Sequence, residues 1–180
     1  MPQSETPTGK PLAIGDPYDG GILAYILQSG DPGYVAGETH GLIAADQDGG
    51  TGILWSIGGL RITGATATAL GTGSTNTTSI IRTLGSPATS YAAGLARAYR
   101  GGGYTDWYLP SRDELNQLFH NRVAIGGFHT ASDDSDNWYW SSSQYAGNAD
   151  HAWFQFFDDG DQYYGLGKYV ASRVRAVRAF

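Results

Sequence analysis

Glycine constrains the fold of this chain more than any other residue type. The 180 residues include 27 glycines, and a glycine inside a helix costs about 1 kcal/mol relative to alanine. This argues against an all-helical bundle. The chain also carries 23 aromatic residues, 5 Trp, 12 Tyr and 6 Phe, which is more than a disordered chain carries. We therefore expect one loop-rich folded domain, because this length suits a single domain.

The charge balance and the lack of cysteine argue against several classes of function. A formal net charge of −6 argues against nucleic acids and anionic membranes as partners. With no cysteine, the chain has no disulfide, thiolate zinc site, iron–sulfur cluster or cysteine nucleophile. Residues 1–10 lack the apolar core of a signal peptide, and no later apolar run is long enough to span a bilayer. We therefore expect no direct membrane insertion.

The order of apolar runs and turn residues predicts an α+β fold, with helices inserted into a mainly antiparallel sheet. Residues 1–10 are polar and proline-containing, and we assign 1–19 to a flexible leader or linker stub before a domain at 20–180. The expected strands lie at 22–27, 41–45, 53–56, 138–143, 152–158 and 173–180, with a long loop at 58–75.

Three helices are expected between these two groups of strands. The first covers 76–84. The second begins with Ser86 at the N-cap and Pro87 at the first helical position, and the triple glycine 101–103 ends it. The third begins at a capping box made by Ser111 and Glu114.

Signals for catalysis and metal binding are weak along the whole chain. No serine lies in a G-x-S-x-G turn, and no two of the histidines (His40, His120, His129 and His151) have the spacing of zinc ligands. We therefore expect no enzymatic activity, no metal site and no cofactor. The segment 46–49 begins like a calcium loop, but Ile57 stands where the bidentate glutamate belongs. The aspartates at 133–136 and 158–161 favour solvated turns, with calcium binding as the open alternative.

Aromatic residues gather near the C-terminus. Between residues 145 and 172 they alternate with glycine, alanine, asparagine and aspartate, and the aliphatic residues are only Leu166 and Val170. Tyrosine supplies a large contact area at low rotamer entropy, and small polar residues supply adaptable hydrogen bonds. We interpret this stretch as a recognition surface, with core packing as the alternative.

Two motifs resemble those of a known family. Residues 103–111 (GYTDWYLPS), followed by DEL at 113–115, resemble the signature GYSDWRLPS-x-DEL, and residues 139–143 (YWSSS) resemble the signature YWSS. Both signatures belong to a domain similar to the C-terminal domain of a collagen-like surface protein of Legionella. That domain is related to the formylglycine-generating-enzyme type of the C-type lectin fold. The resemblance implies a C-type lectin-like fold over roughly 20–180.

The C-terminal part is also similar to the variable proteins of diversity-generating retroelements. In those systems, mutagenesis of template adenines turns AAC or AAT codons into many residue types, but never into Gln, Glu, Lys, Met or Trp. Within 145–172 the residues that such codons cannot reach are Trp153, Gln155, Gln162 and Lys168. These are also the positions that resemble the fixed landmarks of the family. The pattern is compatible with a variable region at about 144–172.

The resemblance implies a non-enzymatic receptor-recognition protein, on a virion or a microbial cell surface, that binds a protein or other surface ligand of a host or neighbouring cell. The implied ligand contacts are Tyr145, Asn148, Asp150, His151, Phe154, Phe156, Asp158, Asp159, Asp161, Tyr163, Tyr164, Leu166 and Tyr169. The implied scaffold residues are Trp107, Trp140, Trp153, Gln155, Gln162 and Arg173.

This sequence differs from the related families in two ways that argue against two of their functions. Formylglycine generation requires cysteines, which this chain lacks. The proline-containing and Trp-Asn-Asp motifs of calcium-dependent lectins are also missing. A sugar-binding lectin and an undiversified structural or adhesive module stay as alternatives.

Overall fold

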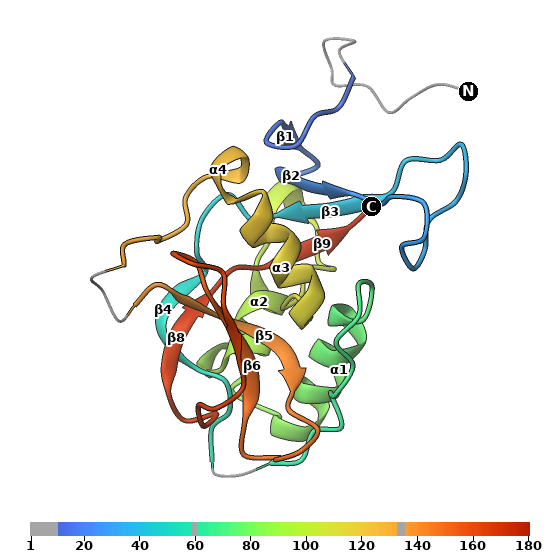
Figure 1. Cartoon of the computed structure of the whole chain (residues 1–180). Coiled ribbons are helices and arrows are strands. Elements are labelled where there is room, and N and C mark those ends of the chain that lie inside the picture. The colour runs from blue at the N-terminus through green and yellow to red at the C-terminus, as the bar shows by residue number, and fades with distance from the viewer. Residues whose placement is uncertain (1–10, 59–60, 133–135) are drawn as a thin grey trace.

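The computed structural model describes residues 11–58, 61–132 and 136–180 (Figure 1). The strands are β1 (Pro17–Tyr18), β2 (Gly21–Ile26), β3 (Gly41–Ala44), β4 (Gly50–Leu54), β5 (Trp138–Gln144), β6 (Ala152–Phe156), β7 (Gln162–Tyr163), β8 (Ala171–Val174) and β9 (Val177–Ala179). The helices are α1 (Gly73–Leu84), α2 (Ala92–Ala98), α3 (Arg112–His120) and α4 (Arg122–Ile125), with short 3₁₀ turns η1 (Ala88–Ser90) and η2 (Gly101–Gly103).

The described strands form two sheets. One has the order β1-β2-β3-β9 and the other β4-β8-β5-β6-β7. The pairings are antiparallel, except for the parallel contact of β5 with β8. Helix α3 packs against strands of both sheets, β2 in the first and β5 and β6 in the second (Figure 1). This arrangement confirms the predicted α+β class and is consistent with a C-type lectin-like fold.

The C-terminal segment joins the two sheets, and here the sequence prediction was wrong. A single strand was expected at 173–180, but β8 and β9 belong to different sheets and Arg175 and Ala176 separate them. Arg175 is fully buried, and its Nε donates to Asp48 at 2.8 Å. A buried arginine requires such a partner. The strand therefore breaks at the position where the Arg175 side chain points into the interior and pairs with Asp48.

Asp48 ties this C-terminal segment to the turn before β4. Its other carboxylate oxygen accepts from Arg173 at 3.0 Å and from the Tyr139 hydroxyl at 2.9 Å. Asp48 therefore pairs with two arginines, and its side chain is itself mostly buried. Within the segment 46–49, Asp48 thus has a structural role as the ion-pair partner of Arg173 and Arg175.

The capping box at the start of α3 is present as predicted. Ser111 Oγ accepts from the amide of Glu114, while the Glu114 carboxylate accepts from the amides of Ser111 at 2.7 Å and Gly71 at 2.9 Å. Glu114 is fully buried, and this burial raises the pKa of its carboxyl. Gly73 lies so close to Glu114 that a Cβ there would be 2.2 Å from Oε2. A buried carboxylate therefore anchors the start of α3 beside α1.

The boundaries of the other helices differ from the predicted ones. Helix α1 begins at Gly73, inside the predicted loop, and ends at Leu84 before Gly85 as expected. Helix α2 begins at Ala92 rather than after Ser86, because Pro87 is extended and the following residues form η1. The triple glycine does not cap α2, which already ends at Ala98. It forms the separate turn η2, in which Gly101 and Gly102 lie so close to Gly20 that neither position has room for a side chain.

Tryptophans and serines build the centre of the fold. Trp55, Trp107 and Trp140 are fully buried, and each indole N–H donates to a backbone carbonyl. The buried serines of β5 also have partners. Ser141 Oγ donates to the carbonyl of Trp153 and Ser143 Oγ to that of Ala67. The Ser141 bond ties β5 to β6, the strand that carries the site described below, and the Ser143 bond ties β5 to the segment before α1.

Strand β1 lies within residues that we had assigned to the leader. Pro17 pairs with Ile22 and Tyr18 with Gly21, so the first sheet begins before Gly20. Residues 1–10 of the expected leader lie outside the described residues.

Candidate ligand-binding face

The hairpin of β6 and β7 carries the densest group of predicted site residues. Along β6, Phe154 and Phe156 point to one side, and Trp153 and Gln155 to the other, as the two-residue period of a strand requires. Phe154 pairs with Tyr163 of β7, a strand that the sequence reading missed. The hairpin therefore places Phe154, Phe156 and Tyr163 on one face.

Two glutamines and a glycine hold the turn of this hairpin. The buried Gln155 donates from Nε2 to the carbonyl of Gly160 at 2.9 Å and to Asn116 Oδ1 at 2.8 Å. Gln162 Nε2 donates to the carbonyl of Arg112 at 2.8 Å and to Gln155 Oε1 at 3.3 Å. Gly160 has a φ of +90° and lies against the Phe119 ring, where a Cβ would be 2.2 Å from the nearest carbon. The turn is thus pinned to α3.

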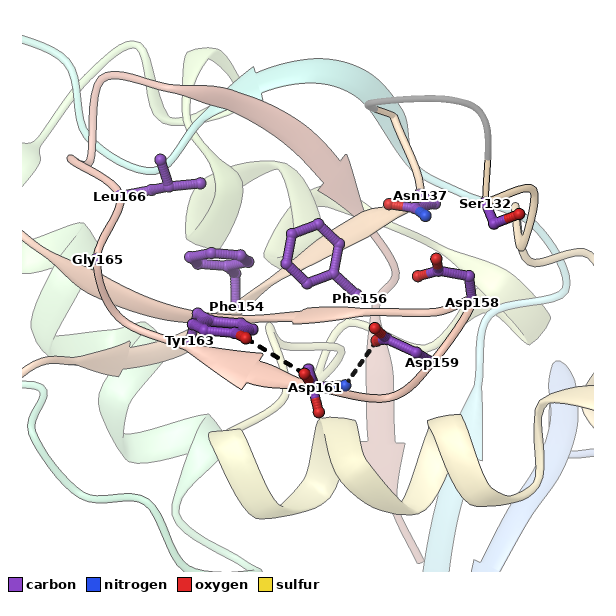
Figure 2. Close-up of a pocket in the computed structure, with 10 residues that line it drawn as sticks. All are labelled: Ser132, Asn137, Phe154, Phe156, Asp158, Asp159, Asp161, Tyr163, Gly165 and Leu166. Atoms are coloured by element: carbon purple, nitrogen blue, oxygen red, sulfur yellow. Dashed lines mark hydrogen bonds between the residues drawn. The ribbon is translucent and has the colours of Figure 1, made fainter.

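A pocket of about 630 Å³ opens on the face that carries the two phenylalanines (Figure 2). We call it the hairpin pocket. Its lining consists of Ser132, Asn137, Phe154, Phe156, Asp158, Asp159, Asp161, Tyr163, Gly165 and Leu166. Figure 2 shows Leu166, Phe154 and Tyr163 toward one end and Asp158, Asp159 and Asn137 toward the other, with Asp161 between them beside Tyr163. Most of the lining comes from the stretch that the sequence singled out as a recognition surface.

The aromatic residues of the pocket differ in burial. Phe154 is only 3% exposed and packs on Trp138 and Trp140, with ring centroids 5.1 and 5.9 Å away. Tyr163 is 48% exposed, and its ring stacks on Phe154 at 6.2 Å. Phe154 therefore belongs to the core as well as to the pocket floor. Tyr163 forms an exposed wall.

The aspartates make the other end of the pocket acidic. Asp159 Oδ1 accepts from the amide of Asp161, and Asp161 Oδ2 accepts from the Tyr163 hydroxyl at 3.2 Å. This hydrogen bond to Asp161 raises the pKa of Tyr163. Asp158 Oδ1 and Asn137 Oδ1 are buried, and neither has a hydrogen-bond partner among the described residues. The described lining contains no basic side chain.

Trp153, which we predicted as scaffold, lies at the surface on the opposite side of β6. It is only partly buried, and its ring makes edge contacts with Tyr145 at 5.8 Å and Tyr164 at 5.0 Å. Those two tyrosines stack on each other at 3.9 Å, and the Arg112 guanidinium lies 5.0 Å from the Trp153 ring. Trp153 thus belongs to a second cluster of rings, in which Tyr164 is exposed and Tyr145 is partly buried, and it is not among the fully buried core residues.

The remaining predicted contacts lie outside the hairpin pocket. Asn148, Asp150 and His151 belong to the turn between β5 and β6, where Asn148 Oδ1 accepts from the amide of Asp150. Tyr169 is 72% exposed and does not line the pocket. The structure thus spreads the predicted contacts over the pocket, the Trp153 cluster and the turn before β6, with Tyr169 apart from all three in the segment before β8.

Lys168 is a buried lysine in the segment between β7 and β8. It is almost fully buried, and its Nζ donates to Gln144 Oε1 at 2.8 Å and to the carbonyl of Arg61 at 2.9 Å. The ammonium also lies 4.3 Å from the Trp55 ring. Burial lowers the pKa of Lys168 to about 8. The side chain joins the end of β5 to the segment before β8.

Sequence reasoning missed Asn137, Ser132 and Arg112. Nothing in the sequence marks Asn137 as a pocket residue, because it precedes β5 and reaches the pocket only through tertiary packing. Among the residues that the structure describes, no group of three histidine, aspartate or glutamate side chains is placed to hold a metal ion. Asp133 and Asp134 of the predicted aspartate cluster lie outside the described residues.

The two sheets and their helices are consistent with a C-type lectin-like domain, and the family match fits a surface or ligand-binding module. The family model of the Lcl C-terminal domain matches residues 45–178, and the chain belongs to that family. This confirms the resemblance carried by the motifs at 103–115 and 139–143. The comparison with curated proteins found no match. In the described part of the chain, no helix combines the length and the apolar character needed to cross a membrane.

Proposed function

We propose that this chain is a non-enzymatic receptor-recognition domain that binds a ligand through the hairpin pocket and the neighbouring exposed rings. The observation that carries the proposal is the contrast in burial around β6. Tyr163 and Tyr164 are 48% and 42% exposed, and they stand on a hairpin fixed by the buried Gln155. Exposed aromatic residues on a rigid support supply contact area at low entropic cost.

The proposal includes diversification of this face by a retroelement. The four residues that adenine mutagenesis cannot produce all have supporting contacts. Gln155 and Gln162 hold the turn, Lys168 is buried, and Trp153 carries the stacked tyrosines. The exposed residues of the same stretch are all of reachable types. Phe154 and Phe157 are also reachable but buried, so the proposed variable positions are the exposed ones.

The neighbouring DNA tests diversification directly. We expect a reverse transcriptase gene beside a near-copy of the segment that encodes residues 144–172, with differences at adenines. If the genomic neighbourhood lacks both, the retroelement proposal is wrong, although a ligand-binding role without diversification remains consistent with the pocket.

Binding itself is tested by matched tyrosine variants. The full chain, coupled to fluorescent beads, is screened against microbial cells and purified surface proteins, and the variants are then measured on the surface that binds. We expect Tyr163→Ala and Tyr164→Ala each to weaken binding by more than about 1 kcal/mol. Tyr34→Ala, which changes an exposed tyrosine of the loop after β2, is the control. Equal binding by all three variants would refute the proposed face.

The proposed location is the surface of a virion or a microbial cell, and family membership supports a surface or ligand-binding module. The main alternatives are an undiversified adhesive module and a sugar-binding lectin. A glycan array probed with and without calcium separates the lectin from the others. Calcium-dependent binding to one class of glycan would favour it over the proposal.

A further inference from the structure

The unpartnered acceptors of the hairpin pocket point to the chemistry of its ligand. We propose that the pocket binds a basic side chain, the guanidinium of an arginine or the ammonium of a lysine, presented by a protein ligand. This inference rests on the proposed function and names the group that enters the pocket.

The first argument is the pair of unsatisfied oxygens. Asn137 is 3% exposed, and its Nδ2 donates to the carbonyl of Ala131 at 3.1 Å, which leaves Oδ1 directed away from that bond. Oδ1 has no partner among the described residues, and neither has Asp158 Oδ1. Both residues line the same end of the pocket (Figure 2). Buried acceptors without donors are costly, so a ligand that brings N–H groups would remove this cost.

The second argument is charge. Asp158, Asp159 and Asp161 line the pocket together, and no lysine, arginine or histidine belongs to its described lining. The whole chain carries a formal net charge of −6. The carboxylates therefore attract a cation, and the partly buried position of Asp158 weakens screening by water.

The third argument is the aromatic wall. Phe154, Phe156 and Tyr163 surround the other end of the pocket, and the faces of such rings attract cations. The aliphatic stem of an arginine or lysine packs on the same rings while its charged head reaches the carboxylates. A pocket that is apolar at one end and acidic at the other matches a side chain of this kind.

A basic side chain fits better than a sugar or a bare metal ion. A sugar hydroxyl both donates and accepts, but the polar groups that line the acidic end are mainly acceptors. A hard cation requires several oxygen ligands converging on one point, with carboxylates usually among them. Among the described residues, no group of three histidine, aspartate or glutamate side chains is placed to hold one. Guanidinium and ammonium groups donate only, which is what the free acceptors require.

The test is a titration of the isotope-labelled full chain, followed by NMR, with N-acetyl-arginine methylamide and with its neutral analogue N-acetyl-citrulline methylamide. We expect the arginine probe to shift the amide signals of β6 and β7. It should bind about tenfold more tightly than citrulline, because charge-assisted hydrogen bonds are roughly twice as strong as neutral ones. The lysine analogue should also bind more tightly than citrulline.

Two variants assign this preference to the pocket. Asp158→Asn should reduce arginine binding about tenfold, toward that of citrulline. Glu38→Gln removes the same charge from an exposed residue outside the pocket lining and should leave binding unchanged. Thermal melting confirms that both variants fold.

Each other outcome overturns the inference. Equal affinity for arginine and citrulline at the pocket would refute the charge preference but leave the proposed binding face intact. Signal changes outside the hairpin, an absence of binding, or equal loss in both variants would show that the pocket does not take a basic side chain. Failure of the proposed function appears separately, in the tyrosine variants on the natural surface.

Discussion

The turn of the β6–β7 hairpin depends on one buried amide, and Gln155→Leu tests this dependence. Gln155 is fully buried and makes three side-chain hydrogen bonds, to Gly160, Asn116 and Gln162. Leucine has a similar volume but can neither donate nor accept. The substitution therefore leaves the packing roughly intact and removes the polar contacts that hold the turn.

The expected cost follows from the partners left behind. Gln162 keeps its bond to the carbonyl of Arg112, so it loses little. The carbonyl of Gly160 and the side-chain oxygen of Asn116 lose their donor, and each buried acceptor left unsatisfied costs about 1–3 kcal/mol. Asn116 is partly exposed and can gain a water. We therefore expect a loss of about 2–4 kcal/mol in the free energy of unfolding.

Urea denaturation measures this loss. With a slope of roughly 2 kcal/mol per molar urea, the midpoint should fall by about 1–2 M at unchanged slope. Gln28→Leu is the matched control, because Gln28 is exposed in the loop after β2, and it should cost less than about 0.5 kcal/mol. If Gln155→Leu is as mild as this control, the glutamine does not hold the hairpin and our reasoning about the scaffold is wrong.

Three further predictions concern the support of the site. Asp48→Asn breaks the ion pair with the fully buried Arg175 and should lower the free energy of unfolding by about 3–5 kcal/mol. The melting temperature should fall by roughly 10 °C, and an unchanged melting temperature would contradict the pairing. Burial lowers the pKa of Lys168 to about 8, below that of an unfolded lysine at about 10.4. Between these values the unfolded chain binds more protons, so stability should rise as the pH increases from about 8 to 10. In the Lys168→Met variant the urea midpoint should not show this rise with pH. Parallel pH profiles of the urea midpoint in the variant and the original chain would refute the role of Lys168. Phe154→Ala should lower the free energy of unfolding by about 3–5 kcal/mol because the ring is buried, whereas Tyr163→Ala should lower it by less than about 1 kcal/mol. Similar losses in urea denaturation would show that burial does not distinguish a core residue from a ligand contact.

The sequence predicted local features well where one short motif determines the structure. The capping box of Ser111 and Glu114 and the strands at 22–27, 41–45 and 138–143 needed only neighbouring residues. The second helix was placed wrongly because Pro87 takes an extended conformation before η1. A proline at that position fits a helix start in sequence, and only tertiary packing decides between the two.

The site was predictable as a segment but not as a surface. Codon reachability and aromatic content marked 145–172, and most of the pocket lining comes from it. Three-dimensional placement was needed to show that Phe154 is buried, that Trp153 is at the surface, and that Asn137 joins the pocket. The RVRAVRAF stretch could not be divided from sequence, because the break at Arg175 depends on Asp48, which is 127 residues away.

The central claim is that exposed residues of this face can change, while the hydrogen-bonded residues that support it cannot. Two libraries displayed on yeast test it most directly. In the face library, exposed positions are varied among retroelement-reachable residue types. These positions are Asp159, Asp161, Tyr163, Tyr164 and Tyr169. In the support library, Gln155, Gln162 and Lys168 are varied in the same way.

Resistance to protease reports folding, and selection on a purified protein reports binding. We predict that most members of the face library stay protease-resistant and that selection yields binders, whereas few members of the support library survive. If the face library unfolds as often as the support library, the exposed rings and aspartates are part of the structural core and the account of this face is wrong.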